Sequence, residues 1–231
     1  MTSPASGDST SPPACAVPAR FAGQEISRLP VTQKVVALTF DAGANADGVH
    51  SIRTTLRAKS AKATFFLTGA FANRFRRKTA RIGAEHLVGN HTNTHPDLTT
   101  LTDAQVVAEV TTAQARILQR SGQDPRRFLR FPFGARNQHL VHLVNGLCYV
   151  PFRWTVDTLG WKGTSGGMTV RKVVDRVLAA ATPGEIVLMH VGSNPDDHST
   201  LDADALPQVI DRLRARGYSF VRLSKVMGAA P

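Results

Sequence analysis

Short apolar runs alternate with amphipathic helical segments along the chain, and this alternation restricts the fold more than any other feature. The runs VVALTF (35–40), ATFFLT (63–68) and EIVLMHV (185–191) are typical of buried strands. Weaker strand patterns lie at 86–90, at 128–132, within 148–157 and at 218–223. Helical patterns separate them, at 48–59, on a basic stretch that ends near Arg81, and at 102–120, 169–181 and 204–217. Because strands that alternate with helices pair in parallel, we predict an α/β fold with a barrel-like sheet.

Two of these helices carry clear start signals. Thr102 opens the pattern at 102–120, and Gln105 stands three positions later, which predicts a capping box. Thr169 is in the equivalent position of the helix at 169–181.

The composition changes near residue 34, and we place a domain boundary there. Residues 1–33 begin with a stretch rich in Ser, Pro, Ala and Thr, which predicts a flexible leader. From the length of the chain we predict that residues 34–231 form one domain with a full-sized core. The chain shows no signal-peptide pattern, and no apolar run is long enough to cross a bilayer. A disulfide between Cys15 and Cys148 is expected only if the protein is exported.

The formal net charge is +11, and the densest basic run is RFRRKTAR (74–81). A basic protein can meet nucleic acid, anionic lipid or an acidic polymer. No nucleic-acid-binding motif accompanies the run, so we expect no nucleic-acid partner. The run is typical of a solvated helix face, and the charge also suits an acidic polymeric surface such as a cell wall.

Polar residues stand at or just after the ends of several predicted strands. In parallel α/β folds these ends share one face of the sheet, where reactive groups gather. The residues at such positions are Asp41, His91, His95, Arg130, Asp157 and His190. We therefore predict one pocket that they share.

The stretch NHTNTHPD (90–97) contains two histidines at a spacing of four. Such a pair can face one metal ion, and zinc and related ions accept neutral imidazole and carboxylate ligands. Alone the pattern is weak, because surface or capping histidines also produce it. The position of His91 and His95 after a strand favours the metal site.

The other strand-end residues suit hydrolysis. Asp41 could accept a proton from water activated by the metal, and His190 could protonate a leaving group. Asp157 could hold that imidazole in one tautomer, and Arg130 could orient Asp41 through a bidentate pair. The alternatives are a buried core histidine at 190 and a purely structural ion pair at Arg130.

The stretches TFDAG, HTNTH, RFPFG, VDTLGW and IVLMH stand in this order along the chain. In this order they resemble the five motifs of the polysaccharide deacetylases of carbohydrate esterase family 4, which share the NodB homology domain. The resemblance covers about Lys34 to Met227. It implies the distorted (β/α) barrel of that family.

The resemblance also implies roles for the matching residues in catalysis. Asp41 would be the general base, positioned by Arg130, and His190 would be the general acid, tuned by Asp157. The backbone N–H of Phe133 would stabilise the oxyanion, at a position where the family usually has Tyr.

The remaining matching residues concern the metal and the acetyl group. His91 and His95 would be ligands of a divalent metal, with zinc expected first and cobalt, nickel or manganese as alternatives. Trp161 and Leu188 would line the pocket for the acetyl methyl group.

Ala42 departs from the family pattern, because the first motif is usually T-F-D-D-G and its second acid is a metal ligand. Four outcomes are open. Water or substrate fills the position, Asp41 ligates the metal directly, Asn45 or Asp47 supplies the ligand, or the domain is catalytically feeble and acts as a binder.

We therefore predict a metal-dependent hydrolase that removes acetyl groups from a polysaccharide, foremost N-acetyl groups of peptidoglycan or a chitin-like glycan, with O-acetyl esters as further substrates. The alternative is a weak or inactive carbohydrate-binding module of the same fold, supported by Ala42. We expect a secreted or cell-wall-associated monomer.

Overall fold

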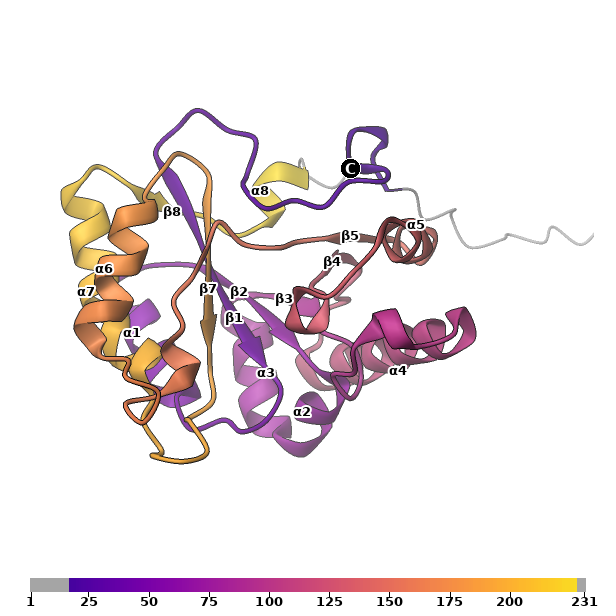
Figure 1. Cartoon of the computed structure of the whole chain (residues 1–231), viewed down its shortest axis with the longest axis horizontal. Coiled ribbons are helices and arrows are strands. Elements are labelled where there is room, and N and C mark those ends of the chain that lie inside the picture. Colours follow the sequence, from indigo (N-terminus) through magenta and orange to yellow (C-terminus); the bar gives the residue numbers. More distant parts are fainter. Residues whose placement is uncertain (1–16, 228–231) are drawn as a thin grey trace, which may run out of the picture.

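The computed structural model describes residues 17–227. In this part of the chain the strands are β1 (Val35–Ala42), β2 (Ala63–Leu67), β3 (Leu87–Asn90), β4 (Arg127–Leu129), β5 (Tyr149–Pro151), β6 (Val156–Asp157), β7 (Glu185–His190) and β8 (Ser219–Phe220). They form one sheet in the order β5-β4-β3-β2-β1-β7-β6, with β8 paired to β1, and every pair is parallel. The predicted distorted (β/α) barrel is confirmed, as a curled parallel sheet with helices packed outside it (Figure 1).

The helices are α1 (Val49–Ala58), α2 (Gly69–Arg74), α3 (Arg76–Glu85), α4 (Asp103–Ser121), α5 (Gln138–Gly146), α6 (Val170–Ala180), α7 (Leu201–Ala215) and α8 (Ser224–Met227). Helices α6 and α7 pack on each other, and α1 packs on α7. On the other side of β1, α2 and α3 pack against α4 (Figure 1). Among the described residues no helix is both long and apolar enough to cross a membrane.

The predicted elements differ from the structure in several places. Strands β4 and β8 are shorter than the predicted 128–132 and 218–223, α7 begins at Leu201 instead of 204, and helix α8 was not predicted. The basic stretch that ends near Arg81 is two helices, α2 and α3, which meet at Phe75.

Helix α5 was not predicted, although Asn137 caps it and Leu140, Val141 and Val144 follow a helical spacing. The segment 148–157 holds two strands, β5 and β6. The predicted capping box of Thr102 and Gln105 is present at the start of α4, and Thr169 caps α6.

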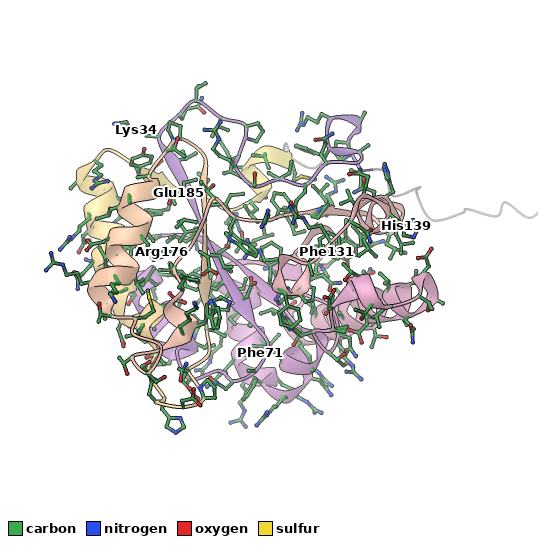
Figure 2. All side chains as sticks on the ribbon, in the orientation of Figure 1. Lys34, Phe71, Phe131, His139, Arg176 and Glu185 are labelled. Atoms are coloured by element: carbon green, nitrogen blue, oxygen red, sulfur yellow. The ribbon has the colours of Figure 1, made fainter. Side chains whose placement is uncertain are left out.

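The alternation of side chains along β1 determines what reaches the pocket. Val36, Leu38 and Phe40 belong to the core cluster that packs against the outer helices, and so does Ala42. Successive side chains of a strand point to opposite faces, so Asp41 points to the inner side of the curled sheet. Aromatic and aliphatic side chains fill the space between the sheet and the helices (Figure 2).

Residues 17–33 pack on the barrel, although we predicted the domain to begin at residue 34. Phe21 and Leu29 are buried, and the backbones of Ile26 and Arg28 form isolated β-bridges with those of Phe152 and Glu185. This part of the predicted leader is therefore packed on the domain. Residues 1–16, including Cys15, lie outside the described residues, so the Cys15–Cys148 disulfide stays a prediction that holds only for an exported protein.

Candidate active site

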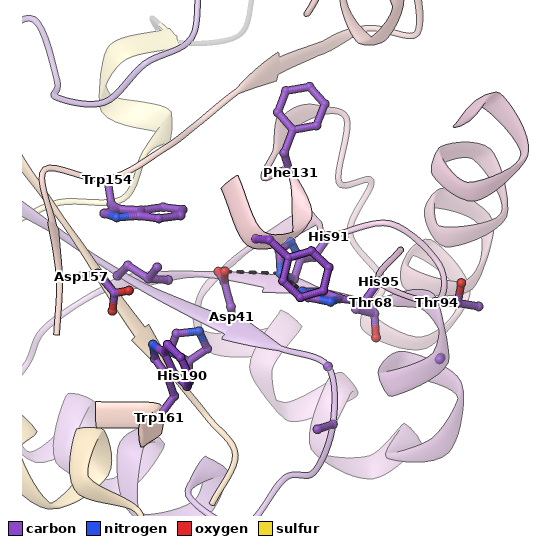
Figure 3. Close-up of a pocket in the computed structure, with 15 residues that line it drawn as sticks. Asp41, Thr68, His91, Thr94, His95, Phe131, Trp154, Asp157, Trp161 and His190 are labelled. Carbon is purple, nitrogen blue, oxygen red and sulfur yellow. Dashed lines mark hydrogen bonds and ion pairs between the residues drawn. The ribbon is translucent and has the colours of Figure 1, made fainter. Parts of the chain in front are cut away.

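The ends of the central strands open into one pocket of about 660 Å³. Eight of the nine predicted site residues line it: Asp41, His91, His95, Phe133, Asp157, Trp161, Leu188 and His190. The ninth, Arg130, is buried outside the pocket lining and contacts Asp41. Figure 3 shows Asp41 and His91 near the middle of the pocket, with Trp154 and Asp157 on one side and His190 and Trp161 on another.

The carboxylate of Asp41 is fixed by a buried arginine. Nη1 of Arg130 donates to Oδ1 of Asp41 at 2.7 Å, and the arginine is 1% exposed. The rest of the guanidinium is also held, because Nε donates to the Phe152 carbonyl and Nη2 to the Arg153 carbonyl. The guanidinium carbon Cζ of Arg130 lies 4.2 Å from the centre of the Phe66 ring. Arg130 therefore orients one oxygen of Asp41 and leaves the other facing the pocket.

Burial alone would raise the pKa of Asp41, but the charge of Arg130, joined at acid pH by the charges of protonated His91 and His190, outweighs it and holds the pKa below its ordinary value. The acid is therefore ionised at neutral pH. Burial also lowers the pKa of His91 to about 4 and lowers that of His95. Both imidazoles are neutral at neutral pH, the form that can bind a metal ion.

The histidine pair lies on a loop, not on a helix. Nδ1–H of His91 donates to the Arg130 carbonyl at 2.8 Å, so Nε2 carries the lone pair. This Nε2 lies 3.1 Å from Nε2 of His95 and 3.3 Å from Oδ2 of Asp41 (Figure 3). The left-handed backbone of Thr92 and His95 turns the loop so that the two rings face each other.

Helix α4 holds this loop in place. The carboxylate of Glu109 accepts the backbone N–H groups of Asn93 and Thr94, both at 2.8 Å, and the Thr94 hydroxyl. Nothing in the sequence marked Glu109, because only the fold brings α4 beneath the loop.

The atoms around Nε2 of His91 suit a divalent cation. A neutral His91 presents a lone pair to a carboxylate oxygen at 3.3 Å and to a second imidazole nitrogen at 3.1 Å. His95 can donate a hydrogen bond from Nε2–H to His91, but the lone pair of His91 and the carboxylate oxygen of Asp41 repel unless a positive charge lies between them, so these residues fit a metal ion. Within residues 17–227 no group of three or more His, Cys, Asp or Glu side chains is arranged to hold one.

Ala42 does not reach this space, because it is fully buried in the core cluster on the outer side of β1. Asn45 bonds both the N–H and the carbonyl of Ser193, and Asp47 accepts the Ser193 hydroxyl. Both candidate replacement ligands are thus bound to the loop after β7. Asp41 is the carboxylate beside the histidine pair.

The opposite wall carries His190 at the end of β7. Its ring meets Trp161 edge to face, with the centroids 6.4 Å apart. Burial disfavours the charged ring, but the nearby carboxylate of Asp202, with the charges of Asp41 and Asp157, raises the pKa of His190 above its ordinary value. Asp157 ends β6, and its Oδ1 accepts the Leu159 N–H at 2.8 Å.

The rim is aromatic. Phe133 is 70% exposed, and its left-handed backbone (φ 58°) forms a turn in which its ring packs edge to face on His95 at 4.6 Å. Trp161 is 46% exposed, whereas Leu188 is buried at the pocket floor. Trp154 also lines the pocket and lies over Arg130, a contact that no sequence motif indicated.

The family profile described as "Polysaccharide deacetylase" matches residues 28–151. A peptidoglycan-N-acetylglucosamine deacetylase of Bacillus cereus is 32% identical over 195 residues, which cover 84% of this chain and 68% of that protein. A chitooligosaccharide deacetylase of Azorhizobium caulinodans is 29% identical over 204 residues, which cover 84% of this chain and 95% of that protein.

A solved Bacillus anthracis protein, called a carbohydrate esterase family 4 pseudoenzyme, has a similar fold. The two structures align with a TM-score of 0.80 at 26% identity, over 89% of this chain and 69% of that chain. A mutant of that pseudoenzyme with restored enzymatic activity aligns with the same TM-score at 28% identity.

Proposed function

The chain belongs to the polysaccharide deacetylase family, and from this premise we propose the reaction that its pocket performs. The protein removes acetyl groups from an acetylated polysaccharide by hydrolysis of the carbon–nitrogen bond of an N-acetyl group. Metal dependence is part of this proposal.

Each side chain has a defined task in the proposed reaction. Asp41, ionised and oriented by Arg130, accepts the proton of the attacking water. His190, on the opposite wall, donates a proton to the departing amine. The N–H of Phe133 donates to the acetyl oxygen as it gains negative charge. Asp157 tunes His190.

His91 and His95 would hold the divalent metal, zinc first among the candidates. When bound, such an ion activates water and polarises the acetyl carbonyl. Trp161 and Leu188 would contact the acetyl methyl group, because both line the pocket and present apolar surface.

The substrate class that we favour is peptidoglycan, followed by chitin-like glycans. The similar proteins of Bacillus cereus and Azorhizobium caulinodans carry these two substrates in their names. The net charge of +11 suits an anionic cell wall. A cell-wall substrate also places the protein outside the cytoplasm.

The observation that carries the proposal is the fixed geometry of Asp41, between Arg130 at 2.7 Å and Nε2 of His91 at 3.3 Å. The test is acetate release from N-acetylated peptidoglycan fragments and chitooligosaccharides, with the metal removed by a chelator and then restored with Zn²⁺, Co²⁺, Ni²⁺ or Mn²⁺. Loss of activity on chelation and recovery with metal are expected.

Asp41→Asn should reduce kcat by about 10³-fold or more, because the base and its charge are both lost.

Asp196→Asn is the matched control, since Asp196 is an exposed acid outside the pocket. It should change kcat less than about twofold. A folded wild-type protein that releases no acetate with any of the four metals would remove the proposal.

A second candidate, a weak or inactive glycan-binding module of the same fold, rests on Ala42 and on the similarity to a pseudoenzyme. It predicts binding of the oligosaccharide in calorimetry without acetate release. Acetate release that depends on Asp41 would exclude it.

A further inference from the structure

His190 has an unpaired nitrogen that points at a buried carboxylate. Its Nδ1 has no hydrogen-bond partner within residues 17–227 and is shielded from solvent. The closest acid is Asp202, whose Oδ2 lies 3.7 Å from Nδ1. The same oxygen accepts the backbone N–H of His190 at 2.8 Å, so the carboxylate is tied to the residue that it faces.

Asp202 is itself held rigidly. It stands in the first turn of α7, where the helix dipole favours negative charge, and it is 3% exposed. Its Oδ1 accepts the hydroxyl of the fully buried Thr158 at 2.6 Å. With one oxygen bonded to Thr158 and the other to His190, the carboxylate cannot rotate away from the ring.

The chain makes room for this carboxylate at Gly160. A Cβ at this position would lie 2.3 Å from Oδ1 of Asp202, closer than any real side chain allows. Gly160 stands one residue before Trp161, whose ring borders His190. The loop that carries the pocket tryptophan is therefore shaped around Asp202.

Asp157 is the other acid on this side of the pocket. Its Oδ1 is used by the N–H of Leu159, and its backbone carbonyl accepts Nε of Arg176. The charged or titratable groups that act on His190 come from β1 (Asp41), β6 (Asp157), α7 (Asp202) and the loop of His95. Among the acids, Asp202 is the one within 4.0 Å of Nδ1 in the part of the chain described.

We propose that Asp202 is the positioning residue of His190, holding a proton on Nδ1 so that Nε2 faces the pocket. This inference rests on the proposed role of His190 as general acid. A small rotation of the ring brings Nδ1–H into hydrogen-bond range of Oδ2. The carboxylate then stabilises the imidazolium that donates a proton from Nε2 to the leaving amine, and it takes no proton itself.

The test compares two substrates that differ in their leaving group. Cleavage of an N-acetylglucosamine oligomer requires protonation of the leaving amine. 4-Nitrophenyl acetate releases a stable phenolate, which leaves without being protonated. Asp202→Asn should reduce kcat on the oligomer by at least about 30-fold with KM within about threefold, and kcat on the aryl acetate by less than about fivefold. Equal loss on both substrates, or a change below threefold on the oligomer, would overturn the proposal.

Two further variants separate positioning from folding. Thr158→Val keeps the shape and removes one bond to Asp202, so it should reduce kcat on the oligomer about tenfold and spare the aryl acetate. Asp157→Asn should affect the oligomer less than Asp202→Asn does. A larger effect of Asp157→Asn would assign the role to Asp157.

A measurement independent of turnover covers the case in which Asp202→Asn does not fold or the wild type releases no acetate. In ¹⁵N-labelled wild-type protein the neutral ring of His190 should be the tautomer protonated at Nδ1, assigned through its loss in His190→Gln. Protonation at Nε2 would overturn the proposal whether or not the protein is a deacetylase. Absence of turnover with the Nδ1 tautomer present would count against the proposed function and leave the positioning intact.

Discussion

At the scale of single residues, two neighbours on β1 have opposite surroundings. Asp41 faces the pocket and meets Arg130 and His91, whereas Ala42 packs in the core with Val36 and Phe40. The period of two along a strand explains the difference. An acid at position 42 must therefore bend the strand end toward His91 to serve as a ligand, or remain buried without a partner.

Ala42→Asp tests whether a protein ligand is missing. Without metal the variant should lose about 2–4 kcal/mol of unfolding free energy, because an unpaired carboxylate would replace a buried methyl group. With Zn²⁺ it should bind the ion at least about tenfold more tightly than the wild type and regain stability. Calorimetric titration and thermal unfolding with and without Zn²⁺ measure both effects.

The control is Ala42→Asn, because an Asn side chain has nearly the same shape as Asp but carries no charge. It should share the loss of stability and gain no comparable affinity. If Ala42→Asp binds Zn²⁺ no better than the wild type, another group, such as Asp41 or water, already fills the position.

At the scale of elements, the loop of His91 and His95, the proposed metal ligands, is held by helix α4, which carries neither histidine. Glu109 on α4 accepts two backbone N–H groups and one hydroxyl from Asn93 and Thr94. The same helix begins at the capping box of Thr102. Two residues of its N-terminal half thus have separate tasks, since Thr102 stabilises the helix and Glu109 fixes the loop.

Glu109→Gln and Thr102→Ala form a matched pair on α4. Gln offers one acceptor oxygen in place of two, so Glu109→Gln should weaken Zn²⁺ binding about 10- to 100-fold, as is usual for residues that orient ligands. Thr102→Ala should cost about 1 kcal/mol of unfolding free energy and leave Zn²⁺ affinity unchanged. Metal titration and chemical unfolding of both variants separate the two effects, and equal Zn²⁺ affinities would show that Glu109 does not fix the loop.

At the scale of the whole molecule, the parallel sheet brings distant residues together. Four strands end at the pocket, and the residues at or just after these ends are Asp41, His91, Asp157 and His190. The register of the paired strands brings the four ends to the same edge of the sheet.

The opposite end of the sheet carries a buried acid. Glu185, labelled in Figure 2, stands at the start of β7. It is fully buried, and neither carboxylate oxygen has a hydrogen-bond partner within residues 17–227.

Glu185 makes global stability depend on pH. Burial raises its pKa to about 8, against the attraction of Arg216. Because the pKa is higher in the folded than in the unfolded state, the contribution to stability is fully present below about pH 4.5 and is lost as pH rises through about 8. The wild type should therefore lose stability between these pH values.

Glu185→Gln removes this ionisation. The variant should be more stable than the wild type at pH 9, by about 1–2 kcal/mol, and should lose less stability between pH 5 and pH 9. Thermal unfolding across that range measures the difference. Parallel pH profiles for the two proteins would show that Glu185 ionises as a solvated acid does.

Much of the fold could be predicted because local patterns produce it. The strand at 35–40, the helix at 102–120 and its capping box depend on apolar periodicity and on neighbouring residues, which the sequence displays directly. The two-helix break at Phe75 was missed, because packing against α4 decides it, and helix α5 was missed although Asn137 and a helical apolar spacing mark it. The candidate site residues were found because strand ends and motifs mark them.

The sequence by itself determined the family, the parallel α/β architecture and the set of residues at the strand ends, because periodicity and motif order are local properties of the chain. Only the tertiary structure decided which partners those residues have. It places Ala42 in the outer core, Glu109 under the histidine loop and Asp202 beside His190. These contacts join segments that no local rule connects, since the curvature of the sheet and the packing of α4 and α7 create them.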